Sequence, residues 1–597
     1  MGTMLKKRSE IEEKYKWNLD DMIPSEEALE NYIKEAEERI ASYESYKGHL
    51  GDSAKKLAEF LKFDVELDEI FSRLFSYARQ KSDEDTAVGE YQALLSKVGT
   101  LSTKAMEASS FAEPEILEIP EEKMNQFLKT EELAHYKLML NRLLAKKEHM
   151  LSEAEETILS AVSEVAQAPD KIFRLFNNAD IRFPVIKDEN GEDIEVTHGR
   201  FIKLLESKDR RVREDAFHAF YSVFRQFANT VAASYESNLK QACFFAKTRK
   251  YQSSREYYLS ANEIPELVYD NLLKTVEERM SLLHRYVSIR KEMLGVDELH
   301  MYDLYVPLTE DYEKEVTYEE AQQIILEGLK PLGEEYLGIL KQGLESRWID
   351  VYENQGKRSG AYSNSVYGVH PYVMMSFNNG MSSVLTLAHE MGHSLHSWYS
   401  NHEQEAAYAH YKIFVAEVAS TCNEVLLLRH LIGKAESVEE KRFLINQMLE
   451  KFRGTLFRQT MFAEFEWKTH QMCWNGVPLT KDTLCKLYHD LNVKYFGEDM
   501  IVDSDIDHEW ERIPHFYRPF YVYQYSTGFA AATAIAGRIL AGDKEALDGY
   551  FKFLKGGCSM TPIELLKLCG LDMEKPDVLN EALNVFETLL DELEACK

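Results

Sequence analysis

Two histidines and a glutamate form the pattern His389-Glu390-Met391-Gly392-His393. An α-helix turns by about 100° per residue, so residues four apart lie on the same face. His389 and His393 can therefore present two imidazole nitrogens to one metal ion. Glu390 projects to the side, where it can reach a water molecule at that ion without binding the ion itself. This spacing is typical of a zinc hydrolase.

A catalytic zinc ion usually has a third protein ligand, which this pattern does not supply. The metzincin arrangement is excluded, because it needs a glycine and a histidine where the chain has His396 and Tyr399. Three ligands from consecutive turns of one straight helix do not easily surround an ion, so we interpret His396 as a supporting or core residue. Glu403 and Glu405 are competitors, but they lie in a polar stretch with no sign of burial.

A carboxylate from a neighbouring helix is the better candidate. The segment 411–430 is predicted to be a helix that is apolar on nearly all sides, and an unpaired carboxylate in such a helix is costly. We therefore prefer Glu417 as the third ligand. Glu424 lies two turns further along the same face, where it can hydrogen-bond a ligand histidine and fix its tautomer. The alternative is that both glutamates pair with Arg429 or with other basic side chains.

An aromatic segment at 513–532 is the second unusual feature. Aromatic stripes more often belong to a core than to a site. Here, however, many of the rings carry a polar end, as in His515, Tyr517, Tyr521, Tyr523 and Tyr525. A peptide-binding cleft would supply acceptors for such groups, and a hydroxyl or imidazole could face a carbonyl oxygen that becomes negative during attack.

The elements that would position these residues are mostly helices. Ser25 is a predicted N-cap, and the helix that follows it has apolar residues at three-to-four spacing, as has the C-terminal segment 581–596. The segment 183–199 is predicted to be a β-hairpin around Asn190-Gly191, and 370–380 a strand that ends just before the histidine helix. Provisional regions are 1–115, 116–200 and 201–597, the last of them catalytic.

Composition narrows the functional classes. The 597 residues carry a formal net charge of -31, which disfavours nucleic acid and anionic membranes as partners. Seven scattered cysteines, none of which looks like part of a metal-binding cluster, fit free thiols in a reducing compartment. No apolar run approaches the roughly 18 residues that span a bilayer, and the N-terminus lacks a signal-peptide core. We expect a cytoplasmic protein, and its oligomeric state stays open.

The chain closely resembles the oligoendopeptidase F family of zinc metallopeptidases, which are relatives of thimet oligopeptidase. The matching stretches are LAHEMGHSLH, FVAEVASTCNE, HPYVMMSF and IPHFYRPFYVYQYSTG, and the opening KYKWNLDDM also looks like that family's N-terminus. The resemblance spans essentially the full length with compatible spacing.

This resemblance implies one zinc ion per chain, bound by His389, His393 and Glu417, with Glu390 as catalytic base. It implies a mainly α fold of two helical lobes around a deep substrate channel, with a small β-sheet near the active site, whose strand at 373–377 lends backbone hydrogen bonds to a peptide. His515 and a tyrosine are similar to the family's substrate-binding and transition-state residues. Tyr523 is the first choice for that tyrosine, and Tyr517 is the second. Residues expected to support the metal ligands or contact substrate are Glu424, His396, Tyr521, Tyr525, His370 and Tyr372.

The expected reaction is hydrolysis of internal bonds in short unfolded peptides. Two other classes compete with it. A metallocarboxypeptidase of similar helical fold also carries the two-histidine pattern but would remove single C-terminal residues. An inactive peptide-binding scaffold would merely pack the histidines, although the intact Glu390 argues against it.

Overall fold

The computed structural model describes residues 5–309 and 315–596. Helices dominate, and strands are few and short, which confirms the predicted mainly α class. The N-terminal helices are α1 (Glu26–Ser42), α2 (Ala54–Glu84), α3 (Gly89–Ser109), α4 (Ala112–Glu118), α5 (Glu121–Phe127) and α6 (Lys137–Ala145). They are followed by α7 (Glu153–Ala166), α8 (Ala168–Leu175), α9 (His198–Leu205), α10 (Arg210–Thr248), α11 (Ser254–Ser260), α12 (Glu266–Glu278) and α13 (Met280–Leu294).

The remaining helices complete the larger part of the molecule. They are α14 (Tyr318–Gly328), α15 (Gly333–Glu345), α16 (Met381–Glu403), α17 (Ala406–Ala409), α18 (Ile413–Lys434), α19 (Val438–Lys451), α20 (Arg458–Trp474), α21 (Lys481–Phe496), α22 (Tyr523–Leu540), α23 (Lys544–Leu554), α24 (Pro562–Leu568) and α25 (Asp577–Ala595). Two short 3-10 helices, η11 (Ile506–Arg512) and η12 (Pro514–Tyr517), lie between α21 and α22.

The helices that the sequence predicts at the two ends of the chain are confirmed. The Ser25 hydroxyl accepts a hydrogen bond from the Ala28 backbone N–H and caps α1, whose inner face buries Ile33 and Ala36. The last helix, α25, buries one stripe at three-to-four spacing, which contains Leu583, Phe586, Leu590 and Leu593.

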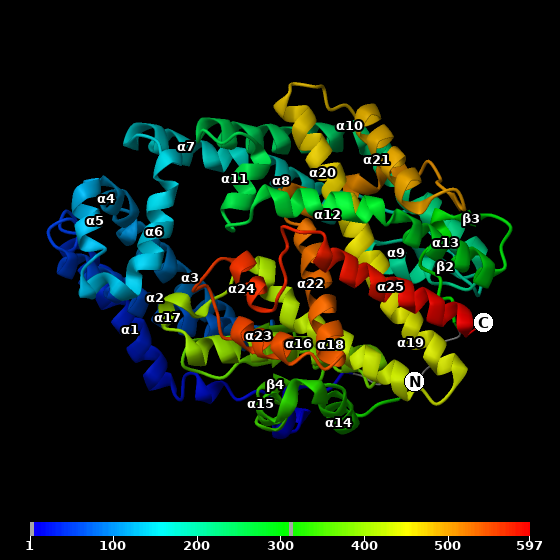
Figure 1. Cartoon of the computed structure of the whole chain (residues 1–597), viewed down its shortest axis with the longest axis horizontal. Helices are drawn as coiled ribbons and strands as arrows, with labels where there is room; N and C mark the ends of the chain where they lie inside the picture. Colours follow the sequence, from blue (N-terminus) through cyan, green and yellow to red (C-terminus); the bar gives the residue numbers. More distant parts are fainter. Residues whose placement is uncertain (1–4, 310–314, 597) are drawn as a thin grey trace.

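The buried side chains form two hydrophobic cores, in agreement with the predicted two-lobed organisation. The smaller core is built mainly from residues 17–140, and the larger core extends from Phe173 to Leu593. In Figure 1 the N-terminal helices lie at the left, α10, α12, α20 and α21 form an upper group, and α14, α15, α16 and α23 lie below. Helix α22 packs on α18 and α25, and it runs between the upper and lower groups.

The predicted hairpin is present but short. Strands β1 (Val185–Lys187) and β2 (Asp193–Glu195) pair antiparallel, with Ile186 opposite Ile194. Gly191 has a φ of 77°, a backbone conformation that glycine adopts without a steric penalty. A parallel pair, β3 (Leu299–His300) with β7 (Met500–Ile501), joins two distant segments of the chain.

A three-stranded sheet lies beside the histidine helix. Its order is β4 (Ile349–Asp350), β6 (Tyr372–Met374), β5 (Tyr362–Asn364), and β5 and β6 pack against α16. Side chains alternate across a strand, and those of β6 enter different cores: Tyr372 and Met374 join the smaller core, whereas Val373 joins the larger one.

The strand predicted at 370–380 is thus confirmed in part, as β6, and the contact of residues 373–377 with a peptide stays a prediction. Strand β6 is paired on both sides, so it has no free edge for a peptide. Beyond β6, the N–H groups of Met375 and Phe377 donate to the carbonyls of Asp350 and Val351. The two outer edges of this sheet belong to β4 and β5.

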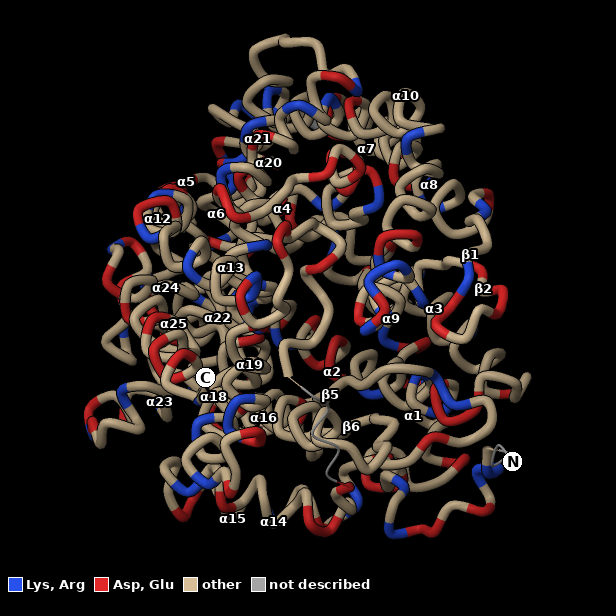
Figure 2. The backbone as a smooth tube through the Cα atoms, turned by 90° about the vertical axis from the view of Figure 1, so that its right-hand side faces the viewer, with Lys and Arg blue, Asp and Glu red and all other residues tan. Residues whose placement is uncertain are grey.

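Acidic and basic residues are interspersed along the helices rather than segregated (Figure 2). Across residues 5–309 and 315–596, no helix combines the length and apolar character that a membrane span requires. All seven cysteines are free.

Candidate active site

Two crossing helices carry the predicted metal ligands. Helix α16 holds the two histidines, and α18 packs directly against it. Gly392 permits this approach, because a Cβ atom there would lie 2.5 Å from the Cα atom of Ser420. The N-cap residue of α16 is Gly380, and no side chain caps this helix.

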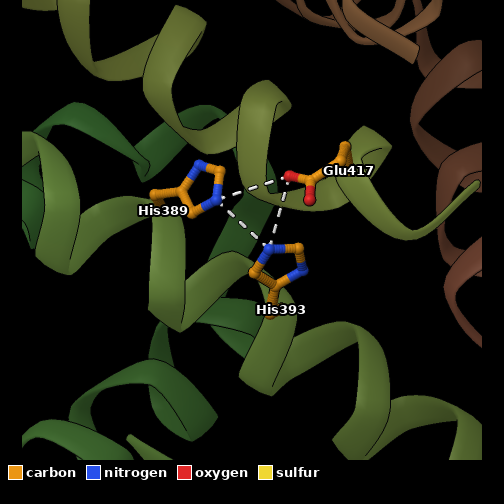
Figure 3. A group of neighbouring side chains, drawn as sticks. All are labelled: His389, His393 and Glu417. Atoms are coloured by element: carbon orange, nitrogen blue, oxygen red, sulfur yellow. Dashed lines mark hydrogen bonds and ion pairs between the residues drawn. The ribbon is translucent and has the colours of Figure 1, made fainter. Parts of the chain in front are cut away.

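His389, His393 and Glu417 converge on one point (Figure 3). The Nε2 atoms of the two histidines lie 3.2 Å apart, and each is 3.4 Å from the Glu417 Oε2 atom. The side chains keep 24%, 17% and 38% of their surface exposed, respectively, so solvent or a ligand can reach the group. The three predicted ligands are therefore brought together, and from two separate helices.

Glu424 lies behind this group, as its spacing from Glu417 suggests. The His389 Nδ1–H group donates to the Glu424 Oε1 atom over 2.5 Å, which leaves Nε2 to face the other two side chains. The second carboxylate oxygen pairs with Lys451 at the end of α19. Arg429, the alternative partner considered for both glutamates, instead pairs with Glu592.

The charges around this group favour different protonation states on neighbouring carboxylates. Burial alone would raise the pKa of Glu417, but His393 and His389 hold it at about 2. Burial also raises the pKa of Glu390, whose side chain is nearly enclosed, and here the histidine charges only partly oppose the effect. Glu417 therefore stays ionised, while Glu390 accepts a proton more readily than an exposed glutamate does.

His515, Tyr521 and Tyr525 form a partly exposed aromatic group on η12 and the start of α22. The Tyr525 hydroxyl lies 3.3 Å from the His515 Nε2 atom, and the Tyr521 ring packs edge-on against Tyr525. Gly528, one turn further along α22, faces α18: a Cβ atom there would lie 3.8 Å from the Glu417 Cβ atom. Burial raises the pKa of Tyr525, and the charge of Glu417 adds to this effect.

The two tyrosines preferred from the sequence, Tyr523 and Tyr517, are both buried in the larger core. Tyr523 is completely buried against Tyr269 and Phe414, and its hydroxyl has no hydrogen-bond partner among the described residues. Tyr517 stacks on Phe173 in the larger core. Tyr523 is the first residue of α22 and is buried, whereas Tyr525, two residues later, is partly exposed.

His396 is a core residue, one of the two roles expected for it. Its ring is fully buried and stacks on Tyr411 with 3.8 Å between ring centroids. Burial lowers the pKa of His396 to about 3, so the ring is neutral at physiological pH. It does not belong to the ligand group.

His370 and Tyr372 were expected near substrate, but they contact the N-terminal segment instead. The His370 ring stacks on Trp348, and its Nε2 atom lies 3.1 Å from an Asp21 carboxylate oxygen. The Tyr372 hydroxyl donates to the Asn18 carbonyl over 3.1 Å. Both residues secure the start of the chain against the sheet.

The competing carboxylates are exposed, as the sequence suggests. Glu403 lies at the end of α16, and Glu405 pairs with His135 over 2.8 Å. Neither joins the histidine pair.

Sequence comparison covers nearly all of the chain. Residues 203–585 match the family described as peptidase family M3, and residues 115–183 match the family described as oligopeptidase F. Oligopeptidase PepF of Bacillus subtilis is 48% identical over 594 residues, which cover 99% of this chain and 89% of that protein. Group B oligopeptidase PepB of Streptococcus agalactiae is 41% identical over 588 residues, 98% of each chain.

Solved structures agree with these matches. The crystal structure of oligoendopeptidase-F from Enterococcus faecium has 38% identity and a TM-score of 0.75, and the match covers 96% of this chain and 99% of that one. A crystal structure from Chlamydophila abortus has 33% identity and a TM-score of 0.94 over 100% of both chains. The chain therefore belongs to peptidase family M3, with an oligopeptidase F region ahead of its catalytic part, and is a metalloendopeptidase.

Proposed function

We propose that the protein is a zinc-dependent oligopeptidase that cleaves internal bonds of short unfolded peptides in the cytoplasm. The observation that carries this proposal is the convergence of His389, His393 and Glu417 within 3.4 Å of one another. Seven free cysteines support a reducing compartment.

The ligand group fits zinc in both chemistry and dimensions. Two neutral imidazoles and one carboxylate form a common catalytic zinc set, in which the fourth position is left for water. A tetrahedral ion with bonds of about 2.0–2.1 Å separates its ligand atoms by about 3.3 Å. The three distances here, 3.2, 3.4 and 3.4 Å, match that separation. Glu424 adds the carboxylate–histidine contact that fixes a ligand tautomer.

Each neighbouring side chain then has a defined task. When bound, zinc would supply Lewis acidity, which lowers the pKa of a bound water toward about 7 and polarises a carbonyl group. Glu390 accepts the proton of the attacking water and returns it to the leaving amine, and its raised pKa suits both steps. Burial lowers the pKa of His515, so this imidazole is neutral and donates through one nitrogen only.

Tyr525 is the tyrosine that we propose as oxyanion donor. Its hydroxyl contacts His515, and it lies on the face of α22 that approaches Glu417. A hydroxyl fixed in this way can stabilise the negative oxygen that develops on the scissile carbonyl. Tyr521 packs against both rings and holds them in place.

The substrate class is proposed from the relatives. The similar proteins are named oligopeptidases and oligoendopeptidases. We propose that the upper and lower helical groups enclose the peptide in a channel, so that short unfolded chains are admitted and folded proteins are excluded.

One digestion tests this proposal. A peptide blocked at both ends is incubated with the enzyme, with and without a chelator, and the products are read by mass spectrometry. We expect internal fragments that disappear with the chelator and return after zinc is added. Stepwise loss of C-terminal residues from an unblocked peptide, with no internal cut, would identify a carboxypeptidase instead.

The Glu390→Gln variant separates binding from turnover. It should retain metal and peptide binding while losing most activity, because only the proton acceptor is removed. Near-normal activity in this variant would refute the assignment of the base.

A further inference from the structure

A second group of metal-binding side chains lies outside the proposed active site. Cys485 of α21 and His508 and Glu511 of η11 bring one sulfur, one nitrogen and one oxygen atom within 4.8 Å of one another. The Cys485 Sγ atom is 3.9 Å from the His508 Nδ1 atom, which is 2.6 Å from a Glu511 carboxylate oxygen. All three groups thus face one point from two packed elements.

The buried carboxylate of Glu511 destabilises this group unless a further cation pairs with it. Its side chain is fully buried, and one carboxylate oxygen bonds His508. The other oxygen, Oε2, has no hydrogen-bond partner among the described residues. A buried carboxylate oxygen without a partner loses its hydration and gains nothing in return. A divalent ion would satisfy the whole carboxylate.

The surroundings also favour positive charge at this point. Two carboxylates lie here, that of Glu511, which is fully buried, and that of Asp507, which is mostly buried. A second pair lies alongside, in which His489 Nδ1 is 2.8 Å from an Asp507 carboxylate oxygen. His489 is four residues after Cys485 in α21, and therefore on the same helical face.

We propose that Cys485, His508 and Glu511 bind a second transition-metal ion of the zinc class, separate from the one at His389. Thiolate, imidazole and carboxylate together suit zinc, a borderline ion that accepts all three donors, far better than they suit calcium or magnesium. A fourth position is left for water or for His489. The sequence did not reveal this group, because its cysteine and its other two members lie far apart in the chain and form no short motif.

Binding of the metal ion at this group releases protons from its ligands. Cys485 gives up its thiol proton, and the proton shared by His508 and Glu511 is released from Nδ1, so that three lone pairs become available. The ion replaces the 2.6 Å hydrogen bond between His508 and Glu511 as the link between these side chains. Metal binding at this group is therefore weakened by acid.

The position of the group gives the ion a structural role. It would clamp η11 to α21, and η11 leads through Ile513 directly into η12, which carries His515. Anchoring η11 therefore steadies the segment that presents His515 to substrate. The inference does not depend on the identity of the first ion or on peptidase activity.

Cobalt(II) distinguishes the two groups, because only the second one contains sulfur. The chelator-treated full-length protein is titrated with cobalt(II) chloride, and the near-ultraviolet absorption of a cobalt–thiolate bond is followed. We expect this absorption to saturate at one cobalt ion per chain beyond the ion bound at His389. Total zinc after reconstitution should be two ions per chain.

Single-residue variants identify the cysteine that gives the cobalt–thiolate absorption. Cys485→Ser should abolish the thiolate absorption and reduce bound zinc by one ion, whereas Cys596→Ser, a free cysteine elsewhere, should change neither. His393→Ala should retain the absorption while losing the other ion. The proposal is overturned if the unmodified protein shows no thiolate absorption, or if the absorption persists in Cys485→Ser. Absence of peptidase activity in the unmodified, zinc-reconstituted protein, with the thiolate absorption of the cobalt form intact, would contradict the proposed function and leave this second site standing.

Discussion

Gly392 of α16 lies against Ser420 of α18, so close that a Cβ atom at position 392 would be 2.5 Å from the Ser420 Cα atom and 2.8 Å from the Ala419 carbonyl oxygen. The contact is between backbones, which cannot rotate away as a side chain can. It sets the spacing between the helix that holds the two histidines and the helix that holds Glu417. The ligand group thus depends on a residue that has no donor atom.

Gly392→Ala should therefore weaken both the fold and the metal site. The methyl group must push α18 away from α16, and overpacking of this kind costs about 1–3 kcal/mol. We expect a lower midpoint of thermal unfolding and a reduced zinc content after dialysis. Gly537→Ala is the matched control, since its Cβ atom would meet nothing within 4 Å in the interior of α22. Equal behaviour of the two variants would show that the close contact is not limiting.

Glu424→Gln should lower zinc affinity without removing a ligand. The glutamine cannot fix the His389 tautomer as the carboxylate does, and it leaves Lys451 without its ionic partner. Removal of such a supporting contact typically lowers metal affinity about 10–100-fold. Competition with a chromogenic chelator measures the change. Glu592→Gln, which interrupts only the pair with Arg429, should keep the affinity of the unmodified protein.

Tyr525→Phe and Tyr523→Phe should have opposite outcomes. Loss of one oxyanion donor lowers kcat by about 10²–10³-fold, and the exposed Tyr525 hydroxyl is the one that contacts His515. Tyr523→Phe removes a fully buried hydroxyl that makes no hydrogen bond, so activity should hardly change. Steady-state kinetics on one peptide are sufficient. A large loss of kcat in Tyr523→Phe alone would restore the tyrosine preferred from the sequence.

Glu466 should make stability depend on pH. It is fully buried in α20, and its carboxylate accepts a hydrogen bond of 2.7 Å from the Phe520 backbone N–H. Burial raises its pKa from 4.5 to about 8. Between these two values the folded state holds the proton more tightly than the unfolded chain. The free energy of unfolding therefore falls as pH rises from 4.5 to about 8, and it then levels off.

Glu466→Gln isolates this contribution, because glutamine is neutral at every pH and keeps an oxygen that can accept the hydrogen bond from the Phe520 N–H. Urea unfolding below and above that window should show the variant gaining stability over the unmodified protein only at the alkaline end. A constant difference at every pH would mean that another group is responsible.

Local patterns were sufficient to select the three side chains that the structure brings together, because the position of each one depends on a single helix. The spacing of His389 and His393 requires only a regular helix, and Glu417 stands out as a carboxylate in an apolar one. The mainly helical class follows from the same periodicity. These features need no knowledge of how distant segments meet.

Features that depend on distant contacts could not be predicted in this way. Lys451 reaches Glu424 only because α19 folds back beside α18, and no local pattern marks it. The choice between Tyr523 and Tyr525 depends on where α22 begins and how it is rotated against α18. Strand β6 has a strand-like sequence, but only the fold shows that β4 and β5 occupy both of its edges.

The alternation of side chains along β6 has a consequence for how the two cores unfold. Tyr372 and Met374 complete the interior that residues 17–140 begin, although they belong to a strand more than two hundred residues away. A fragment that contains only residues 17–140 would lack these two buried side chains. A fragment without residues 17–140 would expose both side chains to water. We therefore expect the two cores to unfold together in one cooperative transition.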